Sequence, residues 1–242
     1  MFHGTIKSIV IAVAFTTSHV AVAAPDEVNG AGNLSGVNDG FGDRIGQSSR
    51  LDLACGETAA LTWSFTCGQG NIDNENAVVI YLDTDEGESG FGDTVGFTDT
   101  GGGNDFLRAA TSGQAAAGEG RADLVFAPTF RANFALAFNK GVAVLYELRA
   151  GGEGHRYVAT VSGSGFGPES PYQFQVSYLQ LGITAGSPVR FFVTYLDPVS
   201  AYRSNEFIGV YASLVPKHNI ENQQLSLKAG DFVVLRTAAE PQ

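Results

Sequence analysis

Apolar and polar residues alternate along many short stretches of the chain. The stretch Tyr172–Leu181 (YQFQVSYLQL) shows the pattern most clearly, since its first, third, fifth and seventh residues are apolar or aromatic. A period of two places those side chains on one face of a β-strand. Ala77–Asp83 (AVVIYLD) is almost continuously apolar instead. Such a run indicates a central strand that is buried on both faces.

Similar runs of β-branched and aromatic residues, bounded by Gly, Asn, Asp or Pro, recur along the chain and are typical of strands. We therefore predict an all-β fold, an antiparallel β-sandwich of the jelly-roll kind with about a dozen short strands and little helix. Room for a short helix remains in Pro216–Gln224. The candidate strands are Arg50–Ala54, Ala60–Thr66, Ala77–Asp83, Asp105–Ala110, Ala122–Ala127, Asn133–Phe138, Val142–Arg149, Arg156–Ser162, Tyr172–Leu181, Val189–Leu196, Glu206–Ala212 and Phe232–Thr237.

The N-terminal residues have the pattern of a secretory signal peptide. Lys7 precedes the apolar run Ile9–Phe15, and Ala21-Val22-Ala23 is a small-x-small cleavage motif. The apolar run is shorter than the ~20 residues that span a bilayer. We expect residues 1–23 to be removed near Ala23, so that the protein is secreted or periplasmic. Residues 24–48 are then a Gly-rich flexible lead-in or an edge segment, and residues 49–242 form a single β-sandwich domain.

The net charge limits which binding partners we expect, and the cysteine content bears on disulfide formation in an exported protein. The formal net charge is −11, which repels nucleic acid and anionic lipid head groups, so we expect no nucleic-acid partner. No second apolar stretch approaches transmembrane length. In an exported chain, the two cysteines Cys55 and Cys67 are expected to form a disulfide.

An acidic, glycine-rich stretch follows the apolar run at 77–83. Hard oxygen ligands on a flexible loop suit Ca²⁺, and Asp83, Asp85, Asp93 and Asp105 are the candidate ligands for such an ion. The stretch lacks the glycine at the sixth position and the glutamate at the twelfth that an EF-hand requires. A solvated acidic loop at the end of a sheet is the alternative.

Aromatic side chains are the candidate sugar-binding residues. Trp63, Tyr146, Tyr157 and Tyr202 lie on predicted strands or beside them, where a ring could stack on a pyranose. Alternation within Leu61–Phe65 also fits a core position for Trp63, and each tyrosine fits a half-buried strand position.

One short motif occurs twice. Gly40-Phe41-Gly42-Asp43-Arg44-Ile45-Gly46 and Gly90-Phe91-Gly92-Asp93-Thr94-Val95-Gly96 share five of seven residues. The likeness does not extend further, so shared turn chemistry explains it more simply than a true repeat.

Two segments resemble a known family. Ala77–Asp85 (AVVIYLDTD), then a Gly-rich acidic loop and Asn104–Arg108, resembles the DOMON-like sandwiches, which include the family-nine carbohydrate-binding modules. Tyr172–Gly182 with Gly186–Tyr195 resembles a late hairpin of that group, although Ser177 stands where proline is usual. The resemblance implies an extracellular β-sandwich that binds sugar or haem, with a structural calcium in some members.

Only some of the functional residues of this family have counterparts in the chain. Asp83, Asp85 and Asp105 match its acidic positions. The paired tryptophans that clamp sugar have no counterpart, and neither does the pair of Met or His ligands that haem requires.

Three functions follow from these observations. The favoured one is a non-catalytic module that binds extracellular carbohydrate and carries no catalytic residues. The first alternative is a structural or adhesive protein whose partner is another copy of itself, joined at a sheet edge. The second is an unrecognised secreted glycoside hydrolase, because two carboxylates brought together from different strands leave no sequence motif. Motifs for nucleophilic or zinc hydrolysis are absent from the sequence.

Overall fold

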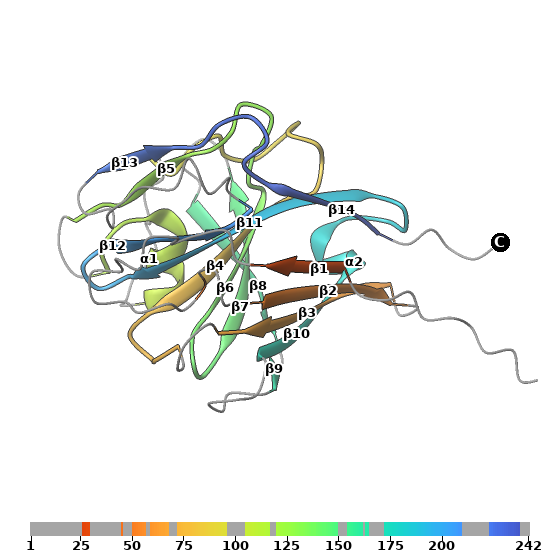
Figure 1. The fold of residues 1–242 in the computed structure, drawn as a ribbon, viewed down its shortest axis with the longest axis horizontal. Helices are drawn as coiled ribbons and strands as arrows, with labels where there is room; N and C mark the ends of the chain where they lie inside the picture. The colour runs from red at the N-terminus through yellow and green to blue at the C-terminus, as the bar shows by residue number, and fades with distance from the viewer. Residues whose placement is uncertain are drawn as a thin grey trace, which may run out of the picture.

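The computed structural model describes residues 26–29, 45, 50–56, 59–67, 72–95, 105–116, 120–149, 154–161, 163–164, 172–209 and 223–237. These residues form fourteen strands and two short helices, arranged mainly as antiparallel sheets (Figure 1). The prediction of an all-β, sandwich-like fold is therefore confirmed. No helix within these ranges is long and apolar enough to cross a membrane.

The smaller of the two main sheets has five strands. Their order is β1 (Asp26–Asn29), β2 (Arg50–Gly56), β3 (Ala60–Thr66), β10 (Tyr172–Ser177) and β9 (Gly163–Ser164), and β3 pairs with β10 across more than a hundred residues of sequence. All neighbouring strands in this sheet run antiparallel.

The larger sheet has seven strands. Its path is β12 (Tyr202–Ile208), β11 (Pro188–Asp197), β4 (Ala77–Asp83), β6 (Phe134–Phe138), β7 (Ala143–Arg149) and β8 (Gly154–Val161), and β14 (Val233–Arg236) also pairs with β11. β8 therefore forms one edge of this sheet, and β12 lies at the opposite edge.

The space between the two sheets is filled by an inner core of apolar side chains. Trp63 and Phe65 from β3 meet Ile80 from β4 and Phe191 from β11 there, all fully buried. The rings of Trp63 and Phe191 meet edge to face, with centroids 5.4 Å apart. Each such side chain contributes on the order of 1.5–3 kcal/mol by leaving water, so this core holds the sheets together.

A third layer covers the other face of the seven-stranded sheet (Figure 1). It contains helix α1 (Phe106–Ser112) and the parallel pair β5 (Asp123–Val125) and β13 (Gln224–Ser226). Side chains from this layer pack on outward-facing residues of β4, β6, β7 and β11 to form an outer core. The protein thus has two cores, one on each face of the larger sheet.

Two predicted strands are wrong where the chain carries helix caps. The predicted strand Asp105–Ala110 is helix α1, because the Asp105 carboxylate accepts a hydrogen bond from the backbone N–H of Arg108 and Gly113 ends the helix at φ 67°. The predicted strand Tyr172–Leu181 stops at Ser177, where a capping box with Gln180 starts the helical turn α2 (Tyr178–Leu181). Local capping overrides the alternating pattern at both places.

The segment predicted to be flexible contributes a strand. Within residues 24–48, β1 pairs with β2 through four residue pairs and forms one edge of the five-stranded sheet, as the edge-segment alternative expects. A short helix was proposed within residues 216–224. Residues 216–222 lie outside the described residues, and Gln224, the last residue of the segment, begins β13.

The expected disulfide conflicts with the register of β2 and β3. Cys55 is paired with Leu61, and Arg50 is paired with Thr66, so Cys67 lies beyond the far end of β2. Six residues of strand separate Leu61 from Cys67, or about 20 Å at ~3.4 Å per residue. A disulfide requires Cα atoms within about 7 Å, so this register keeps the two residues too far apart for a Cys55–Cys67 bridge.

Candidate functional site

The acidic loop after β4 is organised around the buried carboxylate of Asp83. Its Oδ1 accepts hydrogen bonds from the backbone N–H groups of Gly87 (2.9 Å) and Asp85 (3.3 Å), and its Oδ2 lies 3.4 Å from the Arg190 guanidinium. Burial raises the pKa of Asp83, while the bond from Gly87 and the charge of Arg190 act in the opposite direction. Asp83 therefore folds the loop back on itself.

The loop then meets a neighbouring segment at Gly90. Gly90 has φ 88°, and a Cβ there would lie 2.4 Å from the carbonyl oxygen of Ala132. The close approach allows Phe91 and Ala132 to exchange two backbone hydrogen bonds of 2.8 and 2.9 Å. Only glycine fits both the backbone angle and the space, so this residue fixes where Phe91 lies.

The next residues form a strip alongside β5. The backbone N–H of Phe126 donates to the carbonyl of Gly92, and the N–H of Thr94 donates to the carbonyl of Leu124, both at 2.8 Å. The Thr94 hydroxyl also accepts from the N–H of Leu124. These bonds set Phe91, Asp93 and Thr94 along one wall of a pocket.

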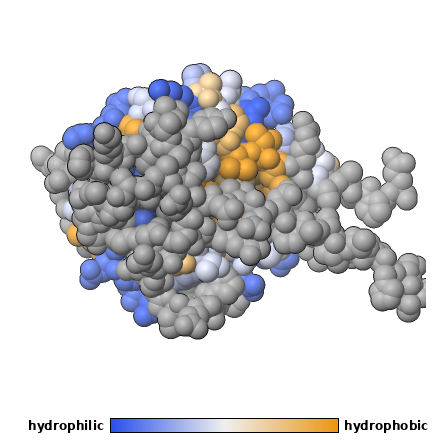
Figure 2. Space-filling view, viewed as in Figure 1, coloured by the Kyte–Doolittle hydropathy of each residue, from blue (hydrophilic) through white to orange (hydrophobic). Residues whose placement is uncertain are grey.

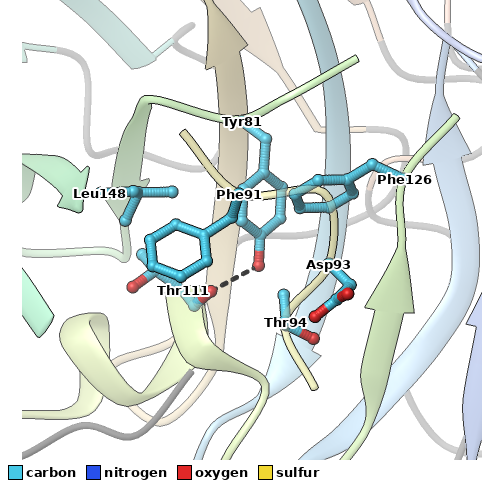
Figure 3. A pocket seen from close by; sticks show the side chains of 7 residues that line it. All are labelled: Tyr81, Phe91, Asp93, Thr94, Thr111, Phe126 and Leu148. Carbon is cyan, nitrogen blue, oxygen red and sulfur yellow. Dashed lines mark hydrogen bonds between the residues drawn. The ribbon is translucent and has the colours of Figure 1, made fainter. Parts of the chain in front are cut away.

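The pocket opens over the outer core (Figure 3). The space that a water molecule can occupy inside it is about 10 Å³, and it is lined by Tyr81, Phe91, Asp93, Thr94, Thr111, Phe126 and Leu148. The Tyr81 hydroxyl donates to the carbonyl of Thr111 at 2.8 Å, and burial raises the pKa of that phenol. Four of the seven lining side chains are aromatic or aliphatic, and the space between them has room for about one water molecule.

A polar cluster adjoins the pocket where α1 meets β7 and β8. Asp105, the N-cap of α1, accepts a hydrogen bond from the Tyr146 hydroxyl at 3.1 Å. His155 lies edge-on to the Tyr146 ring, with centroids 5.6 Å apart, and its Nε2 contacts the Thr111 hydroxyl. Burial and the charge of Arg108 lower the pKa of His155 to about 3, although Asp105 acts to raise it.

Tyr157 on the edge strand β8 is the large aromatic side chain with the most exposed surface among the described residues, at 59%. Its partner across the strands is Tyr146, at the position where β8 carries a bulge. Its hydroxyl accepts a hydrogen bond from the backbone N–H of Thr160 at 2.7 Å and meets the Thr160 hydroxyl at 3.0 Å. The ring is therefore held in place while much of it faces solvent.

The predicted aromatic binding residues are divided between several places. Tyr146 and Tyr157 are neighbours, and Tyr146 contacts Asp105. Trp63 is fully buried in the inner core, where its ring and that of Phe191 meet at nearly a right angle, as the core alternative expects. Tyr202 is half-buried on β12, at the opposite edge of the sheet from β8.

The predicted calcium ligands do not converge in the described part of the chain, where no three His, Cys, Asp or Glu side chains gather as a metal site would require. Each aspartate has a local role instead. Asp85 accepts from the N–H of Ser89 at 3.0 Å, and Asp93 accepts from the N–H of Val95 at 3.0 Å. Asp105 caps α1, far along the chain from Asp83.

Tyr81, Phe91 and Phe126, the aromatic walls of the pocket, do not stand out as binding residues in the sequence. The doubled Gly-Phe-Gly-Asp motif was the available signal, because its second copy supplies both Phe91 and Asp93. Of the first copy, the structure describes only Ile45, which is buried in the inner core.

Comparison with known proteins adds no relative, since no family model, curated protein or solved structure matches this chain.

Proposed function

We propose that the protein is a non-catalytic, extracellular β-sandwich module that binds carbohydrate through the surface around Tyr157. The observation that carries the proposal is the held but exposed ring on an edge strand. A tyrosine offers a large, rigid contact area and loses little conformational entropy on binding. The resemblance to carbohydrate-binding sandwiches supports the same ligand class.

A polar group beside the ring suits a ligand with many hydroxyls. The Thr160 hydroxyl lies 3.0 Å from the Tyr157 hydroxyl on the same strand. Hydroxyl groups both donate and accept hydrogen bonds, so this pair can orient a sugar that stacks on the ring. Arg156, which forms an ion pair with Glu147 across the strands, points to the opposite face of the sheet and is not part of this surface.

The neighbouring His155 supports binding rather than catalysis. With a pKa of about 3, its imidazole is neutral near pH 7 and is far from the pKa that favours general base catalysis there. Its Nε2 contacts Thr111, whose hydroxyl donates to the carbonyl of Arg108 at 2.8 Å. This threonine is engaged as part of α1 and is not poised as a nucleophile.

A structural calcium ion is not part of this proposal. The carboxylate of Asp83 already receives hydrogen bonds from Gly87, Asp85 and Arg131, and it faces Arg190. A cation there would have to displace these donors.

The test is a polysaccharide pull-down followed by titration with the best oligosaccharide. Tyr157→Ala should abolish retention, whereas Tyr157→Phe should only weaken it, because the ring face remains but the hydrogen bonds that hold it are lost. Val234→Ala on β14, which trims another exposed apolar residue, is the matched control and should bind as the wild type does. Retention by Tyr157→Ala equal to that of the wild type would refute the proposed surface.

Self-association is a second candidate, favoured by β1. This strand reaches the edge of the five-stranded sheet from the N-terminal segment and is joined to β2 through residues 30–49. A terminal edge strand of this kind can pair with another copy in place of its own sheet. Sedimentation velocity over a range of concentrations should then show oligomers that disappear when residues 24–48 are deleted. Monomers at every concentration would exclude this function.

A further inference from the structure

We propose that Tyr157 closes the free edge of β8, so that this edge of the larger sheet cannot pair with a second copy of the chain. The proposal concerns the backbone edge of the strand and does not rest on the glycan-binding function, although Tyr157 takes part in both. It follows from the direction of the backbone groups of β8, the position of the Tyr157 hydroxyl and the bulge beside it.

The hydrogen bonds of β7 show which backbone groups of β8 face outward. The N–H of Leu148 donates to the carbonyl of Asn133, the residue before β6, at 2.9 Å. Successive residues of a strand direct their N–H and C=O groups to opposite sides, so Val144, four residues from Leu148, also bonds toward β6. Thr160 lies opposite Val144. The N–H and C=O of Thr160 therefore point away from β7, toward the open edge.

The edge strand β8 would otherwise be an exposed template for pairing. It has eight residues, and Arg156, Tyr157 and Thr160 are exposed. Among the described strands, only β7 pairs with it. An open edge of this length offers a row of N–H and C=O groups to another chain. A second copy suits it, because two identical edges can pair antiparallel about a two-fold axis.

The Tyr157 hydroxyl takes the place of the acceptor that a partner strand would supply. The N–H of Thr160 donates to this hydroxyl at 2.7 Å, and the Thr160 hydroxyl lies 3.0 Å from it. In a longer sheet, the same N–H would donate to a carbonyl of the next strand, about 4.8 Å away. Because the hydroxyl bonds three residues further along the strand, the exposed ring lies alongside the edge where a new strand would pack.

An irregular register beside Tyr157 also disfavours pairing. Leu145 lies opposite Ala159 and Tyr146 lies opposite Tyr157, so β8 carries one extra residue, Val158, between these pairs. A bulge of this kind bends the strand and increases its twist. Bulges at sheet edges are a common protection against pairing with other chains. The bulge and the tyrosine together leave no regular edge for a second copy.

Sedimentation velocity in sugar-free buffer tests the proposal independently of the pull-down. Tyr157→Ala removes both the acceptor and the ring, so a larger share of this variant than of the wild type should sediment as dimer at each concentration. Tyr157→Phe keeps the ring but loses the acceptor, and should give an intermediate share. Sedimentation of both variants that matches the wild type at every concentration would overturn the proposal.

Hydrogen exchange of the Thr160 amide, followed by NMR, tests the contact itself. Tyr157→Phe removes the acceptor, so this amide should exchange roughly two- to tenfold faster than in the wild type at concentrations where both are monomeric. The amide of Ala159, which faces β7, should exchange at the same rate in both proteins. Equal exchange of Thr160 in the two proteins would also overturn the proposal.

A proline variant shows whether the backbone edge is the surface that associates. Thr160→Pro removes the outward N–H without breaking a bond to β7, so its combination with Tyr157→Ala should restore the wild-type sedimentation. The competing surface is the apolar patch in Figure 2 beside β14 and α2 of Figure 1, where Val234 and Leu179 are 53% and 90% exposed. Val234→Ala, added to Tyr157→Ala, should leave the dimer share unchanged. Dimers that persist with Thr160→Pro, or that disappear with Val234→Ala, would overturn the assignment to β8.

Discussion

Replacing Gly90 with alanine should destabilise the loop that forms the pocket wall. Gly90 has φ 88°, and a methyl group there would lie 2.4 and 2.7 Å from the carbonyl oxygen and carbon of Ala132 and 2.9 Å from the nitrogen of Asn133. All three are backbone atoms, so no side chain can rotate away. The substitution must push the loop off its neighbour.

The size of the effect follows from two costs. A non-glycine residue with this positive φ costs about 1–2 kcal/mol. Separation of the loop from Ala132 also loses the two backbone hydrogen bonds of Phe91, with a net contribution of roughly 0.5–1.5 kcal/mol each. Gly90→Ala should therefore lower the free energy of unfolding by about 2–5 kcal/mol. For a chain of this size that corresponds to a fall in Tm of roughly 4–20 °C.

Gly92→Ala is the matched control two residues away. A Cβ on Gly92 would meet nothing within 4 Å, and its φ is not positive. Its unfolding free energy should stay within about 0.5 kcal/mol of the wild type. Urea unfolding and thermal melts of the three proteins make the comparison. If Gly90→Ala is as stable as Gly92→Ala, the close packing of the loop against Ala132 is incorrect.

Three further outcomes are expected. The pKa of His155 is lowered from 6.5 to about 3 on folding, so its contribution to stability is present above pH 6.5 and is lost as the pH falls toward 3. Urea unfolding should therefore show a weaker loss of stability with acid in His155→Asn than in the wild type. Arg203→Ala should cost about 3–5 kcal/mol because it leaves a cavity and unpaired acceptors, whereas exposed Arg156→Ala should cost under about 1 kcal/mol in the same assay. Peptide mapping without reductant should find Cys55 and Cys67 in peptides that are not linked to each other; a linked pair would contradict the register of β2 and β3.

The strands with the clearest patterns could be predicted from the sequence. The predicted limits of β3 and β4 agree with the structure, because alternation in one and a continuous apolar run in the other are direct signs of burial on one face or two. The helices were missed although their caps were visible. Asp105 with Gly113, and Ser177 with Gln180, mark the helix ends, but the short apolar runs between them match a strand equally well.

Features that depend on pairing could not be predicted. The register that separates Cys55 from Cys67 is set by contacts between whole strands, and no local pattern encodes it. The pocket joins residues from β4, the following loop, α1, the segment after β5 and β7. Spacing along the chain carries no sign of this assembly, so only the Gly-Phe-Gly-Asp motif pointed to part of it.

Strand β4 belongs to both cores, and this restricts how the sheet can be altered. Val78, Ile80 and Leu82 lie in the inner core, whereas Val79 and Tyr81 lie in the outer one. Deleting or inserting one residue before β4 would turn every side chain to the opposite face. Tyr81 would then enter the space between the sheets, and an aliphatic residue would replace it at the pocket. Because the strand has no solvent-facing side to absorb such an error, indels before β4 should be far less tolerated than indels before β8, which is half exposed.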